Sequence, residues 1–307
     1  LSNAKLTAAA MSWTGNAEGY GRTNLQQANL SGADLITAYM RGVDLSNADV
    51  SGAYLHAADL SEAMLQKTDF EQADLFGVKF RNADLEGSIL TGDVLLGADF
   101  SQANLSDADL AQANLFWANL TGANLTNANL QGTNFAVAIL TDANLSQANL
   151  QEAYLHAAEL SNANLSNANL NQSDLSAGIL IQANLSGAEL KDANVKRATL
   201  TRADLSQTAL QGTTFQGADL IGANLMQANL QAAYLADAYL TEADLSQADL
   251  KDAVLTGAEL SDANLDGANL EEAITEGTSE TSSIDTEHQR VYHMAALEWP
   301  NARVSKE

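Results

Sequence analysis

Large apolar residues recur at every fifth position from Leu25 to Leu270 without one change of register. Forty-two of these 50 central positions are Leu, and the others are Met40, Val50, Phe70, Phe80, Phe100, Phe135, Val195 and Phe215. Helices repeat their apolar positions every three or four residues and strands every two, so a strict period of five predicts neither as a continuous element. It predicts a solenoid, in which very short extended pieces alternate with corners.

The residues around each central position predict which way each unit faces. A small residue stands two places before it, and this residue is Ala at 39 of the 50 positions. Residues two apart on an extended piece point the same way, so we expect the Ala and the central residue to face inward. The Asn or Asp between them and the two variable residues that follow are then expected to face outward.

The resulting A(D/N)Lxx pattern, as in Ala103-Asn104-Leu105 and Ala163-Asn164-Leu165, resembles the pentapeptide-repeat family. Its uninterrupted Ala-Asn-Leu style resembles that of cyanobacterial members. The resemblance implies an all-β fold, a right-handed quadrilateral parallel β-helix with four units per 20-residue coil. Fifty units then give a solenoid of about 12 coils, roughly 60 Å long at about 4.8 Å between neighbouring strands.

The frame of the repeat divides the chain into four parts. Residues 1–22 are predicted to form a partial coil and an irregular cap in which Trp13 packs over the open end, and residues 23–274 to form the β-helix. Residues 275–284 resemble a polar linker. Residues 285–307 are predicted to form a helix or tail, with Asp285 as the helix cap and Pro300 as the stop. This last segment could cover the final coil, dock a partner or be disordered.

A coil of 20 residues sorts the outward positions into columns, and one column is apolar. It contains Ile36, His56, Phe76, Leu96, Phe116, Ala136 and His156, with Trp117 and Val137 beside it. The next column is polar, with Gln26, Ser46, Gln66, Glu86 and Ser106. A contiguous apolar patch is typical of an interaction site. We therefore predict a protein interface at Ile36, His56, Phe76, Leu96, Phe116, Trp117 and His156. Its occupant could be a second, parallel tube, a different protein, or a terminal segment of the same chain.

Three inward positions carry further expectations. Phe80 and Phe100 are 20 residues apart, so they should stack in adjacent coils. Asp93 stands where a small residue is normal, and burying an unpaired carboxylate is costly. Either Ser88 or a backbone group satisfies Asp93, or the tube bulges over residues 92–96, and we expect the bulge.

Charge and composition limit the kinds of partner and the cellular locations that we expect. The chain has 39 acidic and 14 basic residues, a net charge of −25, which disfavours direct binding of nucleic acid. It has no Cys, so disulfides are excluded, and no run of 18 apolar residues that would span a membrane. We expect a cytoplasmic location. The periplasm or a lumen stays open, since a leader would be missing from a chain that begins at Leu1.

No arrangement of residues predicts catalysis, a cofactor or a metal site. His56 and His156 are 100 residues apart, which is five coils or roughly 24 Å, so they cannot share one metal ion. His288 and His293 are five residues apart, a poor spacing for one helix face. We therefore expect a non-enzyme.

Two charged clusters suggest other partners. Lys191, Lys196, Arg197 and Arg202 form a basic band that could bind an anionic partner or be simply solvated. Outward acids gather near the C-terminus at Asp237, Glu242, Asp252, Asp262 and Asp266. Some members of the resembled family are acidic rods that mimic duplex DNA, and this implies an alternative function as an inhibitor or protector of a type II topoisomerase (gyrase). The leading interpretation is a non-catalytic scaffold rod that binds a protein or itself.

Overall fold

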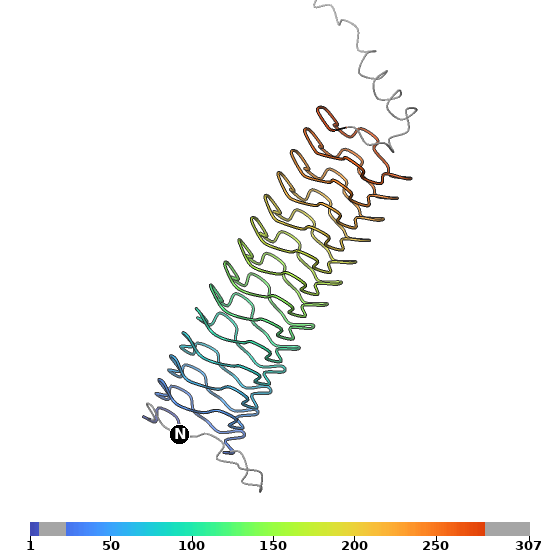
Figure 1. Cartoon of the computed structure of the whole chain (residues 1–307). Helices are drawn as coiled ribbons and strands as arrows, with labels where there is room; N and C mark the ends of the chain where they lie inside the picture. Colours follow the sequence, from blue (N-terminus) through green and yellow to red (C-terminus); the bar gives the residue numbers. More distant parts are fainter. Residues whose placement is uncertain (6–22, 280–307) are drawn as a thin grey trace, which may run out of the picture.

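A computed structural model describes residues 1–5 and 23–279, which wind into one long tube from the N-terminal to the C-terminal end (Figure 1). The residue before each central position forms a parallel bridge with the residue 20 places further on, from Asn24–Asp44 to Val254–Ile274. This offset means four five-residue units per coil, as predicted. Within the described ranges every strand is a single bridged residue and no helix occurs.

The polar residues of the motif turn the corners. The carbonyl of Leu25 accepts a hydrogen bond from the Ala28 N–H (3.0 Å), and the second turn residue, Gln27, has a φ of 56°. These are features of a type II turn. The Asn or Asp side chain supports the turn, as where Asn104 Oδ1 accepts from the Ser106 N–H (3.3 Å). Each unit therefore builds its own corner, and the tube has four columns of corners.

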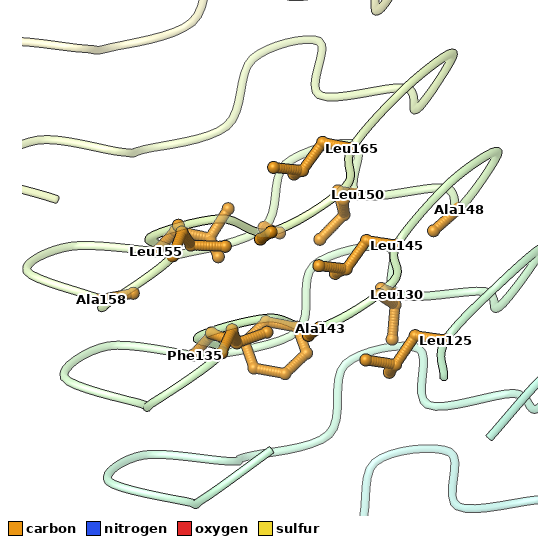
Figure 2. Close-up of a cluster of buried hydrophobic side chains, with 14 of the residues drawn as sticks. Leu125, Leu130, Phe135, Ala143, Leu145, Ala148, Leu150, Leu155, Ala158 and Leu165 are labelled. Carbon is orange, nitrogen blue, oxygen red and sulfur yellow. The ribbon is translucent and has the colours of Figure 1, made fainter. Parts of the chain in front are cut away.

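The central residues and the small residues before them form the core. Figure 2 shows a stretch in which the side chains of Leu125, Leu145 and Leu165 stack from coil to coil. All three are fully buried, and each contributes on the order of 1.5–3 kcal/mol. Phe80 and Phe100 stack as predicted, with ring centroids 4.9 Å apart and planes inclined by 18°.

Asn side chains connect neighbouring coils, most regularly on the face that contains Asn104 to Asn184. Asn124 Nδ2 donates to Asn104 Oδ1 (2.9 Å), Asn164 to Asn144 (3.0 Å) and Asn184 to Asn164 (3.2 Å). The same Oδ1 atoms also accept the turn N–H groups. Each of these Asn residues therefore stabilises the turn of its own unit and also links its coil to the next. The outward direction predicted for these Asn residues is confirmed.

The ends of the tube differ from the regular repeat. Lys5 bridges Asp34, an offset of 29 residues in place of 20, so the first coil contains nine extra residues. Coil geometry continues past residue 274, because the Ser279 N–H bonds to the Ala258 carbonyl (3.1 Å). The irregular cap around Trp13 and the predicted helix over residues 285–307 lie outside the described residues. In the described ranges no helix is long and apolar enough to cross a membrane.

Candidate docking surface

One of the four corner columns is mostly apolar over seven successive coils. It consists of two parallel rows, which together we call the apolar corner: Ile36, His56, Phe76, Leu96, Phe116, Ala136 and His156 in the first row, and Thr37, Ala57, Gly77, Gly97, Trp117, Val137 and Ala157 in the second. Each pair follows an inward central residue, so these side chains project from the tube. Phe76 and Phe116 are exposed to 44% and 43%, and Trp117 to 69%.

An apolar groove of about 290 Å³ lies in the middle of this corner. It is lined by Phe76, Leu96 and Phe116 from the first row and by Gly77, Gly97 and Trp117 from the second. The absence of side chains at the two glycines makes the hollow. Trp117 bounds it, since its Cε3 lies 3.7 Å from where a Cβ on Gly97 would be. Nothing lies within 4 Å of the corresponding point on Gly77, so the groove is open there.

The backbone does not account for the bulky residues of the second row. Trp117 and Val137 both have a φ of 59°, in the left-handed region that large and β-branched side chains disfavour. On the other corners the equivalent position usually carries Gln, Asn, Asp or Gly, as at Gln147 and Asn167. Residues held against their backbone preference often mark functional surfaces.

Apolar residues also flank the corner on both adjoining faces. The face before it presents Tyr54, Val94 and Tyr154, and the face after it presents Tyr39 and Ile139. All five are at the position that most units fill with Asn or Asp, and all five are exposed. They widen the apolar surface without supporting the core.

The structure gathers four of the predicted interface residues and spreads the others. Phe76, Leu96, Phe116 and Trp117 share the groove. His56 stacks on Phe76 with ring centroids 4.8 Å apart, whereas Ile36 is half-buried near the first coil. His156 lies two coils beyond Phe116 and places Nδ1 2.9 Å from Ser176 Oγ. The sequence reasoning missed Gly77 and Gly97, although their small size beside Phe76 and Leu96 was a usable signal.

Asp93 is buried inside the tube near the same level. Neither of its carboxylate oxygens nor Ser88 Oγ has a hydrogen-bond partner in the described structure. Burial raises the pKa of Asp93 to about 8, and the Gln72 and Ala73 amides of the preceding coil only partly oppose this. Those amides lie close enough to lower the pKa but do not reach hydrogen-bond geometry.

The expected bulge at Asp93 is wrong, because the bridges Asp74–Val94 and Val94–Asn114 keep the 20-residue register. Instead, the coils around Asp93 are joined by fewer backbone hydrogen bonds. In this part of the described chain, the backbone hydrogen bonds that the repeat would form from Gln72 to Thr91, from Leu75 to Val94 and from Val94 to Ala73 are missing. The neighbouring coils fix the register, so the buried carboxylate disturbs bonds without displacing a residue.

Matches to a family model cover most of the tube. The model, described as pentapeptide repeats in eight copies, matches residues 21–56, 53–92, 98–136, 118–156, 138–176, 173–207, 196–231, 209–247 and 233–272. The chain belongs to the pentapeptide repeat family. Membership implies that the parallel β-helix is right-handed, and proteins of this family are generally non-catalytic scaffolds that interact with other proteins.

Several solved structures of pentapeptide repeat proteins match the chain. HetL, a protein involved in heterocyst differentiation regulation from the cyanobacterium Nostoc sp. strain PCC 7120, is 31% identical, with 77% of this chain and 89% of HetL covered and a TM-score of 0.38. QnrB1, a plasmid-mediated fluoroquinolone resistance protein, is 16% identical, with 70% and 92% covered and a TM-score of 0.41. A pentapeptide repeat protein from the Arabidopsis thaliana thylakoid lumen is 29% identical, with 40% and 79% covered and a TM-score of 0.31. No curated protein matches the sequence.

The basic band of this pentapeptide repeat protein occupies three corners of one coil. Lys191 is on one corner, Lys196 and Arg197 on the apolar corner's continuation, and Arg202 on the next. All four are exposed, and none forms an ion pair within residues 1–5 and 23–279. The patch for an anionic partner therefore stays a prediction.

The C-terminal acids surround the tube. Asp237, Asp252 and Asp266 lie on three different corners, and Glu242 and Asp262 share the fourth. They form an acidic end on which no single row of carboxylates runs along the axis. Across the described residues, no group of three or more His, Asp or Glu is placed to hold a metal ion.

Proposed function

We propose that this protein is a non-catalytic scaffold rod that binds protein through its apolar corner. The observation that carries this proposal is the groove between Phe76, Leu96, Phe116 and Trp117, which lies on the outside of a tube whose core is already complete. Monomeric proteins rarely expose a contiguous apolar patch without a use for it. Exposed aromatic side chains in such a patch are the usual anchors of an interface.

The opposite side of the tube is mostly polar at the same coil levels. The corner diagonally opposite carries Ser146, Ser166 and Ser186. The face beside it is lined by Asn144, Asn164 and Asn184, which are hydrogen-bonded to one another. A partner that covered those polar residues would gain little from the hydrophobic effect. We propose a cytoplasmic location, with the periplasm or a lumen as the alternative.

The proposal predicts that Phe76→Ser combined with Phe116→Ser abolishes complex formation and leaves the fold unchanged. Both rings project outward, so the circular dichroism spectrum should match the wild type. Affinity capture from the source cells should lose the specific polypeptide that the wild type retains. The matched control is Ser146→Ala combined with Ser166→Ala on the opposite corner, which should retain it. Equal capture by both double variants would refute the proposal.

A second candidate function is supported by the acidic end. Net charge and the ring of carboxylates around the last coils fit an acidic mimic of DNA that inhibits or protects a type II topoisomerase. Because the acids form no row along the tube, we expect weak or no inhibition of gyrase supercoiling at micromolar protein. Potent inhibition, lost when Asp252, Asp262 and Asp266 are each changed to Lys, would reverse the order of the two candidates.

A further inference from the structure

The apolar corner carries one protruding side chain and one open notch. Trp117 is the most exposed large residue of the corner, at 69%. Gly77, in the same row, has free space where a side chain would be, whereas the space over Gly97 is already covered by Trp117 of the same chain. Trp117 and the notch over Gly77 are two coils apart, roughly 10 Å at the strand spacing.

The sizes of the corner residues are complementary about the level of Leu96 and Gly97. In the second row, Gly77 and Trp117 are each one coil away from Gly97, on opposite sides of it, and Ala57 and Val137 are each two coils away. In the first row, Phe76 is matched by Phe116 and His56 by Ala136. A small residue thus stands opposite a large one, or an aromatic ring opposite an aromatic ring. A two-fold axis across the tube at this level would bring these pairs together in an isologous contact.

We propose that the occupant of the apolar corner is a second copy of this chain, aligned antiparallel, with Trp117 of each copy in the notch over Gly77 of the other. This rests on the proposed function and names its partner. The two-fold axis lies at Leu96 and Gly97. The contact then extends from Thr37 to Ala157 over six coil spacings, roughly 29 Å.

Charge is compatible with the antiparallel arrangement. In the antiparallel dimer Lys196 lies five coils beyond Leu96, past the described N-terminal end of the other tube. On the flanking faces Asp74 faces Asn114 and Lys79 faces Asn119. Asp99 faces its own counterpart but is already paired with Arg81.

A parallel dimer would set Asp74 of each copy against Lys79 of the other, but it would be less favourable in three other ways. It would set Lys196 and Arg197 of one copy against the same two cations of the other, and would also align the two acidic ends. It would also require Leu96 of the second copy to enter the space over Gly97 that Trp117 fills.

The chain has no cysteine, so single introduced cysteines report the orientation directly. His56→Cys and Ala136→Cys are made in separate chains, mixed as full-length protein and oxidised. A disulfide needs Cα atoms within about 7 Å, so the antiparallel dimer should give the mixed 56–136 product and no 56–56 product. Adding Trp117→Ala to both chains should abolish the cross-link, whereas the Ser146→Ala control should retain it. Circular dichroism confirms that each variant is folded.

Two results would overturn the inference. A 56–56 disulfide as the main product would mean a parallel dimer. A monomeric wild type without any cross-link would mean that the occupant is not a second copy. In the second case, capture of another protein that is lost in the Phe76→Ser and Phe116→Ser double variant would leave the proposed function standing. If no such protein were captured, the antiparallel dimer and the proposed docking function would both be rejected.

Discussion

Asp93→Ala should stabilise the tube by several kcal/mol at neutral and alkaline pH. The carboxyl is buried without a hydrogen-bond partner, and most units have Ala at this position. Burial raises its pKa from the ordinary 3.8 to about 8. The difference, at about 1.4 kcal/mol per pKa unit, corresponds to roughly 6 kcal/mol.

The sign of the pH dependence follows from the direction of the shift. Since the folded protein holds the proton more tightly than the unfolded chain, the contribution of Asp93 to stability falls as pH rises from about 4 to about 8. Above about 8 the penalty is constant. The difference in unfolding free energy between Asp93→Ala and wild type should therefore be several kcal/mol larger at pH 9 than at pH 4, where only the cost of the unpaired neutral carboxyl is removed.

Urea unfolding, together with hydrogen exchange of residues 72–95, measures this difference in unfolding free energy at both pH values. Hydrogen exchange is needed because coils of a solenoid can open locally. The control is Asp93→Asn, which removes the charge but keeps an unpaired polar group, so it should lose the pH dependence and recover only part of the stability. A difference that is the same at pH 4 and pH 9 would exclude a buried, protonated Asp93.

Phe100→Ala should destabilise the tube by about 3–5 kcal/mol, because it leaves a cavity in a core that packs at the density of a crystal. Phe100 is fully buried and stacks on Phe80. The matched control is Phe116→Ala, the same substitution fewer than 20 residues away but at an outward position. It should cost about 1 kcal/mol or less in dilute protein. Thermal unfolding of both variants compares them, and equal losses would contradict the assignment of inward and outward positions.

The architecture could be predicted from the sequence because each unit builds its own corner. The Leu and Ala spacing, the Asn side chain that accepts a turn N–H, and the polar turn residues all act within a few residues. Repetition then fixes the 20-residue coil, and columns such as Phe80–Phe100 follow from it. The nine extra residues of the first coil could not be located in this way, because they interrupt the repeat.

The details of the candidate site were harder to predict because they depend on neighbouring coils. The groove exists because Trp117 folds over Gly97 and leaves Gly77 open, and the sequence alone does not give that direction. The bulge expected at Asp93 was wrong for a similar reason. A local rule about buried carboxylates neglected the register that the coils on both sides impose.

Sedimentation velocity over a concentration series tests most directly whether the apolar corner is an interface. The wild type should sediment as a concentration-dependent dimer of long tubes. The Phe76→Ser and Phe116→Ser double variant should weaken this dimer by at least about 100-fold, since each ring is an expected anchor, and the Ser146→Ala and Ser166→Ala control should behave as the wild type. A double variant that dimerises as tightly as the wild type, or a wild type that stays monomeric throughout, would contradict the account.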